Sequence, residues 1–303
     1  MSKPLLALTL PALVTACAGA APPELAAAVD ELNAAPCRVE KLTTWSTAGD
    51  EGRLVFSPDG RWAMFHREGP AGLELAESRR LPGGGWSPPT RPTFASDFLE
   101  FDPFIALDGA TVYYTSFRPT TPDGAGRPDG DLWRVRRTAT GWTAPEHLGP
   151  TVNTDANEFF PSVTADGTLY WNSDRQDGVG AWDLWRAPRT GAGFGAAAPL
   201  PGDLNTAIWE FNPTLTPGGR LLALGSLDPD PAAPYSDVFF SLRVAGEYSA
   251  AVDAGPCVNT ELEEYHPTID WARNRLIFVR RNPDTSGDFY AVPLTAALRA
   301  LAE

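Results

Sequence analysis

The stretch EFFPSVTADGTLYWNSDRQDGVGAWDLWRA at residues 158–187 decides the fold, because its pattern returns along most of the chain. It opens on a glutamate, reaches an Asp-Gly turn eight residues later, continues as an aromatic run and ends in DLWRA. Glutamates in the same place of the pattern are separated by 49, 58, 52 and 54 residues; they are Glu51, Glu100, Glu158, Glu210 and Glu264. A period of this size indicates one supersecondary unit repeated five times.

Each repeat contains short apolar runs rich in Val, Tyr, Trp, Phe and Leu, separated by Gly, Pro, Asp and Asn. This pattern is typical of strands joined by tight turns. In the second repeat it predicts four strands, at 104–107, 111–116, 131–136 and 146–149. Four short strands in a unit of this length match one blade of a β-propeller. We therefore predict an all-β fold, a five-bladed β-propeller.

The two ends of the chain are predicted to meet in the last blade. The fifth repeat has no clear fourth strand, whereas residues 37–51 resemble the fourth strand and the crossover of other repeats. Ser46-Thr47 precedes Glu51 by five residues, as Asn153-Thr154 precedes Glu158. We predict that an N-terminal strand at 39–42 pairs beside 288–292 and closes the ring. The propeller then spans 37–294, and 295–303 is a C-terminal tail.

The repeats also carry a family resemblance. The motifs DG, SxR and DLW in PSVTADGTLYWNSDRQDGVGAWDLWRAPR, together with FSPDGRWAMFHRE, resemble WD40-like repeats of the Pro-Asp-Gly kind. Such repeats occur in TolB-like propellers and in many bacterial envelope proteins, and the resemblance covers most of 38–294. It implies a fold and a compartment rather than an activity, since one fold hosts many functions. TolB itself has six such blades and a separate N-terminal domain, so its partners are not transferred to this chain.

The N-terminus reads as an export signal. Residues 1–17 contain Lys3, an apolar run at 5–14, and Val14-Thr15-Ala16-Cys17, which resembles a bacterial lipobox. In that interpretation Cys17 is the lipidated residue; the alternative is an ordinary secretory signal. Residues 18–36 are predicted to be an Ala- and Pro-rich tether with a short helix at 23–32. We expect an exported protein, either periplasmic or an outer-membrane lipoprotein.

The net charge excludes two classes of binding partner. The net charge of −14 argues against nucleic acid and against docking on anionic lipid, so membrane association would come only through a lipid anchor. A monomer is expected.

The cysteines suggest a disulfide. Cys37 and Cys257 remain if Cys17 is lipidated, and two cysteines in an exported chain suggest that they pair. The alternative is that the repeat alignment puts them at opposite rims.

Strand direction alternates within a blade, so the repeated glutamates, the long loops and the crossovers should share one mouth of the channel. Two readings of the glutamates stay open. They hold a cation, amine or polyhydroxyl ligand over the axis, or each accepts backbone amides at its crossover or pairs with an arginine of the adjacent blade. The candidate ligand contacts are the five glutamates with Arg118, Arg175 and Trp209.

Metal and catalytic motifs are weak. Asp123, Asp129 and Asp131 could offer oxygens to Ca²⁺, but their spacing is not that of an EF-hand loop, and no other cofactor is expected. His66, His147 and His266 lie in different blades without zinc-ligand spacing. The sequence contains neither GxSxG nor HExxH.

The sequence therefore favours a non-catalytic scaffold of the bacterial envelope that binds a protein or a glycan. The alternative is a carbohydrate-active hydrolase that uses carboxylates at the channel mouth, because glycoside hydrolases work with carboxylate pairs.

Overall fold

A computed structural model describes residues 21–34, 36–47, 49–70, 72–121, 124–191, 193–227, 235–283 and 286–303. The predicted signal segment 1–17, with Cys17, lies outside these ranges, as does Asp123 of the predicted Ca²⁺ site. Within them, no helix is both long enough and apolar enough to cross a membrane.

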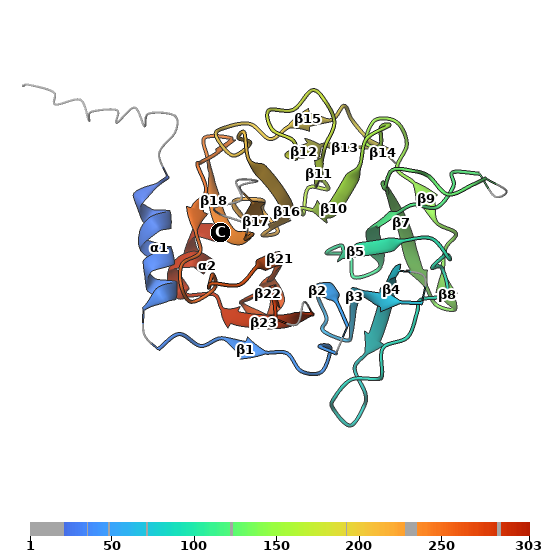
Figure 1. Cartoon of the computed structure of the whole chain (residues 1–303), viewed down its shortest axis with the longest axis horizontal. Helices are drawn as coiled ribbons and strands as arrows, with labels where there is room; N and C mark the ends of the chain where they lie inside the picture. Colours follow the sequence, from blue (N-terminus) through green and yellow to red (C-terminus); the bar gives the residue numbers. More distant parts are fainter. Residues whose placement is uncertain are drawn as a thin grey trace, which may run out of the picture.

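Five antiparallel sheets stand radially around a central axis, so the predicted five-bladed propeller is confirmed (Figure 1). The first blade contains β2 (Glu51–Phe56), β3 (Trp62–Gly69) and β4 (Gly72–Arg79). Its fourth strand is reduced to isolated bridges such as Glu77 with Thr90. The second blade contains β5 (Glu100–Ile105), β6 (Thr111–Ser116), β7 (Asp131–Thr138), β8 (Gly141–Trp142) and β9 (Glu146–His147).

The other three blades repeat this order from the axis outward. The third contains β10 (Glu158–Val163), β11 (Leu169–Ser173), β12 (Asp183–Ala187) and β15 (Ala198–Pro199), with the hairpin β13 (Arg189–Thr190) and β14 (Gly193–Phe194). The fourth contains β16 (Trp209–Leu215), β17 (Leu221–Leu227), β18 (Asp237–Val244), β19 (Glu247–Tyr248) and β20 (Val252–Asp253). The fifth contains β21 (Glu264–Asp270), β22 (Arg275–Arg281) and β23 (Gly287–Pro293), with the 3₁₀ turn η1 (Trp271–Arg273) between the first two.

Ring closure follows the prediction. The N-terminal strand β1 (Glu40–Lys41) pairs antiparallel with β23, with Glu40 opposite Ala291. The hydroxyl of Ser46 accepts a hydrogen bond from the backbone amide of Phe289 at 3.0 Å. In the crossover that leaves the second blade, the equivalent Asn153 accepts the backbone amide of Leu132 in β7. The same crossover position therefore secures the third strand of both the second and the fifth blade.

A disulfide joins Cys37, just before β1, to Cys257, in the turn after β20. Their Cα atoms lie 5.6 Å apart. The alternative of opposite rims is therefore wrong, because Cys257 sits beyond the end of its strand and returns toward the start of β1. The bridge fastens the closing strand to the crossover that leaves the fourth blade.

The segment predicted as a tether contains a helix packed on the propeller. Helix α1 (Pro23–Asn33) buries Leu25, Ala28, Val29 and Leu32. This i, i+3, i+4, i+7 spacing gives the helix one apolar stripe, and burying that stripe holds it on the ring. The stripe packs in one core with the fourth and fifth blades and with α2 (Ala296–Ala302), which occupies the predicted tail. Both helices lie on the outer side of the ring (Figure 1).

Candidate functional site

The repeated glutamates are buried hydrogen-bond acceptors at the start of each innermost strand. Each is at most 2% exposed. The residue four positions earlier donates its backbone amide to Oε2 and its hydroxyl to Oε1; these donors are Thr47, Ser96, Thr154, Thr206 and Thr260. The distances to Glu158 are 2.9 Å for the amide and 2.7 Å for the hydroxyl of Thr154. This is the geometry of the structural alternative, in which each glutamate accepts at its own crossover.

Arginines complete three of these sites, and they come from the same blade rather than the adjacent one. Arg175 donates to Glu158 at 2.8 Å, and Arg280 donates to Glu264 at 2.5 Å. Arg118 forms the equivalent pair with Glu100. Arg118 and Arg175, predicted as ligand contacts, therefore lie against the glutamates of their own blades.

Trp209, the remaining predicted ligand contact, and the described part of the predicted Ca²⁺ site lie in different blades. Trp209 is half-buried in β16, next to Glu210. Asp131 forms an ion pair with Arg127 at 2.7 Å and lies 3.0 Å from His147, and Asp129 pairs with the same arginine. An arginine thus neutralises the described part of the predicted Ca²⁺ site.

The residue two positions after each glutamate turns toward the axis. Every innermost strand has a register shift there, as β-bulges produce. The five residues share a left-handed backbone, which is uncommon outside glycine; they are Arg53 (φ 51°), Asp102 (φ 53°), Phe160 (φ 57°), Asn212 (φ 55°) and His266 (φ 49°). The glutamates are the same in all blades, whereas these axial residues all differ.

Contacts between blades that are not neighbours show that these side chains meet on the axis. Arg53 Nη2, in the first blade, donates to the carbonyl of Pro161 in the third at 2.7 Å. The rings of Phe160, in the third blade, and His266, in the fifth, have centroids 5.1 Å apart. The axis is therefore filled at this level by five unlike side chains, and we take this level as the candidate site.

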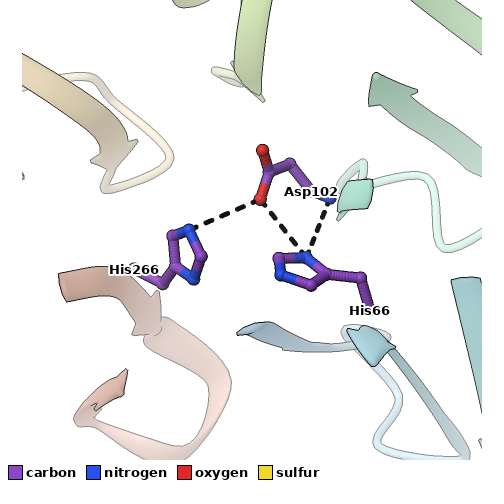
Figure 2. A group of neighbouring side chains, drawn as sticks. All are labelled: His66, Asp102 and His266. Carbon is purple, nitrogen blue, oxygen red and sulfur yellow. Dashed lines mark hydrogen bonds and ion pairs between the residues drawn. The ribbon is translucent and has the colours of Figure 1, made fainter. Parts of the chain in front are cut away.

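Three titratable side chains converge within it (Figure 2). Asp102 Oδ1 lies 3.4 Å from His66 Nδ1 and 3.7 Å from His266 Nε2. The backbone amide of Asp102 also donates to His66 Nδ1 at 3.1 Å. Gly52 makes room for both rings, because a Cβ there would lie 2.2 Å from His66 Nε2 and 2.4 Å from His266 Nδ1.

Burial controls the charges of this cluster. It lowers the pKa of His66 to about 3 and the pKa of His266 well below its usual value, so both imidazoles are neutral at pH 7. Burial also raises the pKa of Asp102 well above its usual value, while the positive charge of Arg53 acts in the opposite direction.

Several buried polar atoms here have no hydrogen-bond partner among the described residues. They are both carboxylate oxygens of Asp102, Nε and Nη1 of Arg53, Nδ1 of His266 and both side-chain polar atoms of Asn212. Buried polar groups are nearly always satisfied by protein or water, so such a group of orphans at one level needs an explanation. A bound polar species or ion would supply it.

The opposite mouth of the channel has a different character. A pocket of about 160 Å³ opens there, lined by the far ends of all five innermost strands. Its apolar lining includes Val55, Ile105, Val163, Leu215 and Ile269. Sequence reasoning placed any site on the glutamate face and missed this apolar pocket.

Sequence reasoning also missed the axial cluster, because it treated the three histidines as unrelated. The available signal was the repeat frame itself. Asp102 and His266 stand two residues after their glutamates, and this is the position where all five repeats differ.

Comparison with known proteins supports the fold. No protein-family profile and no curated protein matches the sequence. Among solved structures, putative TolB from Agrobacterium tumefaciens matches with a TM-score of 0.52 and 15% identity, over 86% of this chain and 90% of that chain. An α-L-arabinofuranosidase from Lactobacillus brevis matches with a TM-score of 0.50 and 13% identity, over 86% of this chain and 92% of that chain.

TolB from Acinetobacter baumannii, at 12% identity and a TM-score of 0.49, matches over 82% of this chain, which spans 56% of its length. The chain has the β-propeller fold that the putative TolB from Agrobacterium tumefaciens also has. Because the identities are low, these similarities establish the fold alone, and the same architecture serves a glycosidase.

Proposed function

We propose that this protein is a non-catalytic binding propeller of the bacterial cell envelope, which recognises a protein or glycan ligand. The observation that carries the proposal is the hydrogen bonding of the five glutamates. Each is held by a Thr or Ser of its own crossover, so the conspicuous carboxylates of the sequence are occupied in holding blades together. A pair of free, facing carboxylates is what glycoside hydrolysis needs.

The shape of the ring also supports binding. Its apolar pocket at one mouth offers a surface to an apolar group of a ligand, and the polar side chains at the axial level offer hydrogen-bonding groups. The pocket is open to a partner, since Leu107 on its rim is 44% exposed.

The hydrolase remains the second candidate, on one observation besides the fold. Asp102 is a buried carboxyl with a raised pKa, which is the state of a general acid. A glycosidase would need a second carboxyl group about 5–10 Å away that is free to act as base or nucleophile.

A ligand screen separates the two candidates. Purified protein is examined by thermal shift against cell-wall glycans, arabinose-containing oligosaccharides and Ca²⁺, and each glycan is then assayed for hydrolysis. The binding proposal expects stabilisation by a ligand without turnover. Hydrolysis that is abolished in Asp102→Asn would overturn it in favour of the enzyme.

The location is tested separately, because it rests on the predicted lipobox. Cys17→Ser should release the protein from the membrane fraction or block its maturation. Unchanged fractionation with normal processing would count against the lipid anchor. That outcome is expected of an ordinary secretory signal, with which the variant is processed and soluble in the periplasm.

A further inference from the structure

We propose that His66, Asp102 and His266 bind a divalent transition-metal ion, Zn²⁺ best of the common ones, on the axis of the propeller. Two imidazoles and one carboxylate suit Zn²⁺ and its neighbours in the first transition row, whereas Ca²⁺ and Mg²⁺ prefer oxygen ligands only. The inference is separate from the observation that carries the proposed binding function, because it rests on two histidines and Asp102 and not on the five glutamates.

The spacing of the donor atoms fits one ion. One donor atom from each residue lies within 4.8 Å of the other two. The individual separations from Asp102 Oδ1 are 3.4 Å and 3.7 Å. Tetrahedral zinc with bonds of about 2.0–2.2 Å places its donors roughly 3.3–3.6 Å apart. Both measured separations from Asp102 Oδ1 therefore lie close to the spacing that one zinc ion requires.

The protonation pattern also calls for a positive species between the three groups. His66 Nδ1 accepts the backbone amide of Asp102, so this nitrogen carries a lone pair and the proton of the ring sits on Nε2. The facing carboxylate oxygen, Asp102 Oδ1, is itself an acceptor without a donor among the described residues. Two acceptors 3.4 Å apart repel one another unless a cation or a proton lies between them. Binding an ion through His66 Nδ1 exchanges one amide hydrogen bond for one metal bond.

Arg53 influences which ligand would occupy the fourth coordination position of the metal, which the protein does not fill. Its charge acts on both histidines and on Asp102, and two of its guanidinium nitrogens lack partners within the described chain. A nearby positive charge weakens the binding of a cation but favours an anion as its fourth ligand. We therefore expect hydroxide, chloride or a ligand carboxylate at that position.

The three ligands come from three blades, which gives the ion a structural effect. His66 lies on β3 of the first blade, Asp102 on β5 of the second and His266 on β21 of the fifth. An ion held by all three crosses the point where the ring closes. Since it binds the folded ring and not the separate strands, it should raise the melting temperature.

The experiment titrates the tag-free exported chain with Zn²⁺ in competition with a chromophoric chelator, after refolding from denaturant in chelator-treated buffer. A parallel titration with Co²⁺ reads the visible absorption that distinguishes tetrahedral nitrogen-oxygen ligation from loosely bound ion. The variants are Asp102→Asn and His266→Asn. Asparagine tolerates the left-handed backbone of both positions and stands naturally at the equivalent Asn212, so both variants should fold.

The wild type should bind one equivalent of Zn²⁺, gain melting temperature with it, and show the Co²⁺ spectrum. Each variant should lose at least tenfold in affinity together with the spectrum. His147→Gln is the matched control, because His147 is the third histidine and lies in the second blade beside Asp131. It should bind like the wild type.

Binding well below one equivalent would overturn the proposal, as would full binding by both variants or an equal loss in the control. If Zn²⁺ fails to bind and infrared spectroscopy shows a protonated carboxyl that Asp102→Asn removes, a proton fills the site and the metal proposal is wrong.

Discussion

Thr154 donates two hydrogen bonds to the carboxylate of Glu158, one from its hydroxyl at 2.7 Å and one from its backbone amide at 2.9 Å. Arg175 from the same blade donates to the same carboxylate at 2.8 Å. Glu158 is fully buried, so these bonds replace all of its water. The triplet ties the crossover, the first strand and the loop after the second strand of the blade to one side chain.

Glu158→Gln should therefore destabilise the protein by about 3 kcal/mol, because the change leaves the Arg175 guanidinium buried without its counter-charge. Denaturant unfolding measures this loss. Glu146→Gln is the matched control. That carboxylate pairs with Arg134 but is 59% exposed, so its removal should cost no more than about 0.5 kcal/mol. Equal stability of the two variants would show that the repeated glutamate does not hold the blade together.

Stability should also depend on pH through Glu210. Burial raises the pKa of this carboxyl to about 7, against about 4.5 in the unfolded chain. The folded state then holds the proton more tightly, so the stabilisation is complete below pH 4.5 and is lost as the pH rises through 7. From pH 5 to pH 8 this group should remove about 2–3 kcal/mol.

The measurement compares denaturant unfolding of the wild type and Glu210→Gln at the two pH values. Gln stays neutral, so the wild type should lose more stability on going to pH 8 than the variant does. Identical pH dependence would mean that Glu210 titrates normally.

Reduction of the Cys37–Cys257 disulfide should loosen the ring closure. The bond closes a loop of 220 residues, and breaking such a bond costs about 2–5 kcal/mol, mainly by freeing the unfolded chain. Thermal melting with and without reductant should show a clear drop. The double variant Cys37→Ala with Cys257→Ala should melt at the reduced value and ignore the reductant; a wild type equally indifferent to reductant would contradict the prediction.

Gly52→Ala should destabilise the axis even without any ligand. The added methyl would meet His66 Nε2 at 2.2 Å and His266 Nδ1 at 2.4 Å, and overpacking of this kind costs about 1–3 kcal/mol. Gly83→Ala is the control, since nothing lies within 4 Å of a Cβ there. Gly83→Ala should be neutral within about 0.5 kcal/mol. Equal melting temperatures for the two variants would show that the imidazoles move aside freely.

Most of the fold could be predicted because the same pattern of strands and turns occurs five times in the sequence. The strand at 111–116 was predicted with its observed bounds, and the pairing of β1 with β23 followed from the missing fourth strand. The innermost strand of the second blade was placed too late, at 104–107, and begins at Glu100. The predicted end, at 107, is also two residues later than the observed end at Ile105, because the turn residues located the turn but not the bulge inside the strand.

The candidate site was less predictable because its residues share no local pattern. Asp102 and His266 are 164 positions apart in the chain and His66 comes from a second strand, so no short motif could join them. Helix α1 was also underestimated. Its stripe of Leu25, Ala28, Val29 and Leu32 is visible in the sequence, but the apolar surface that it covers belongs to the far end of the chain.

The sequence by itself determined the number of blades, the order of their strands and the closing of the ring by its two ends. These are properties of periodicity, and each repeat folds by contacts with itself and its neighbours. Only the tertiary structure decided what stands on the axis. There one bulge per blade turns five unlike side chains inward. Residues from blades that are not neighbours in the ring come within 4 Å of one another. Radial packing, rather than any local preference, brings two histidines and an aspartate together.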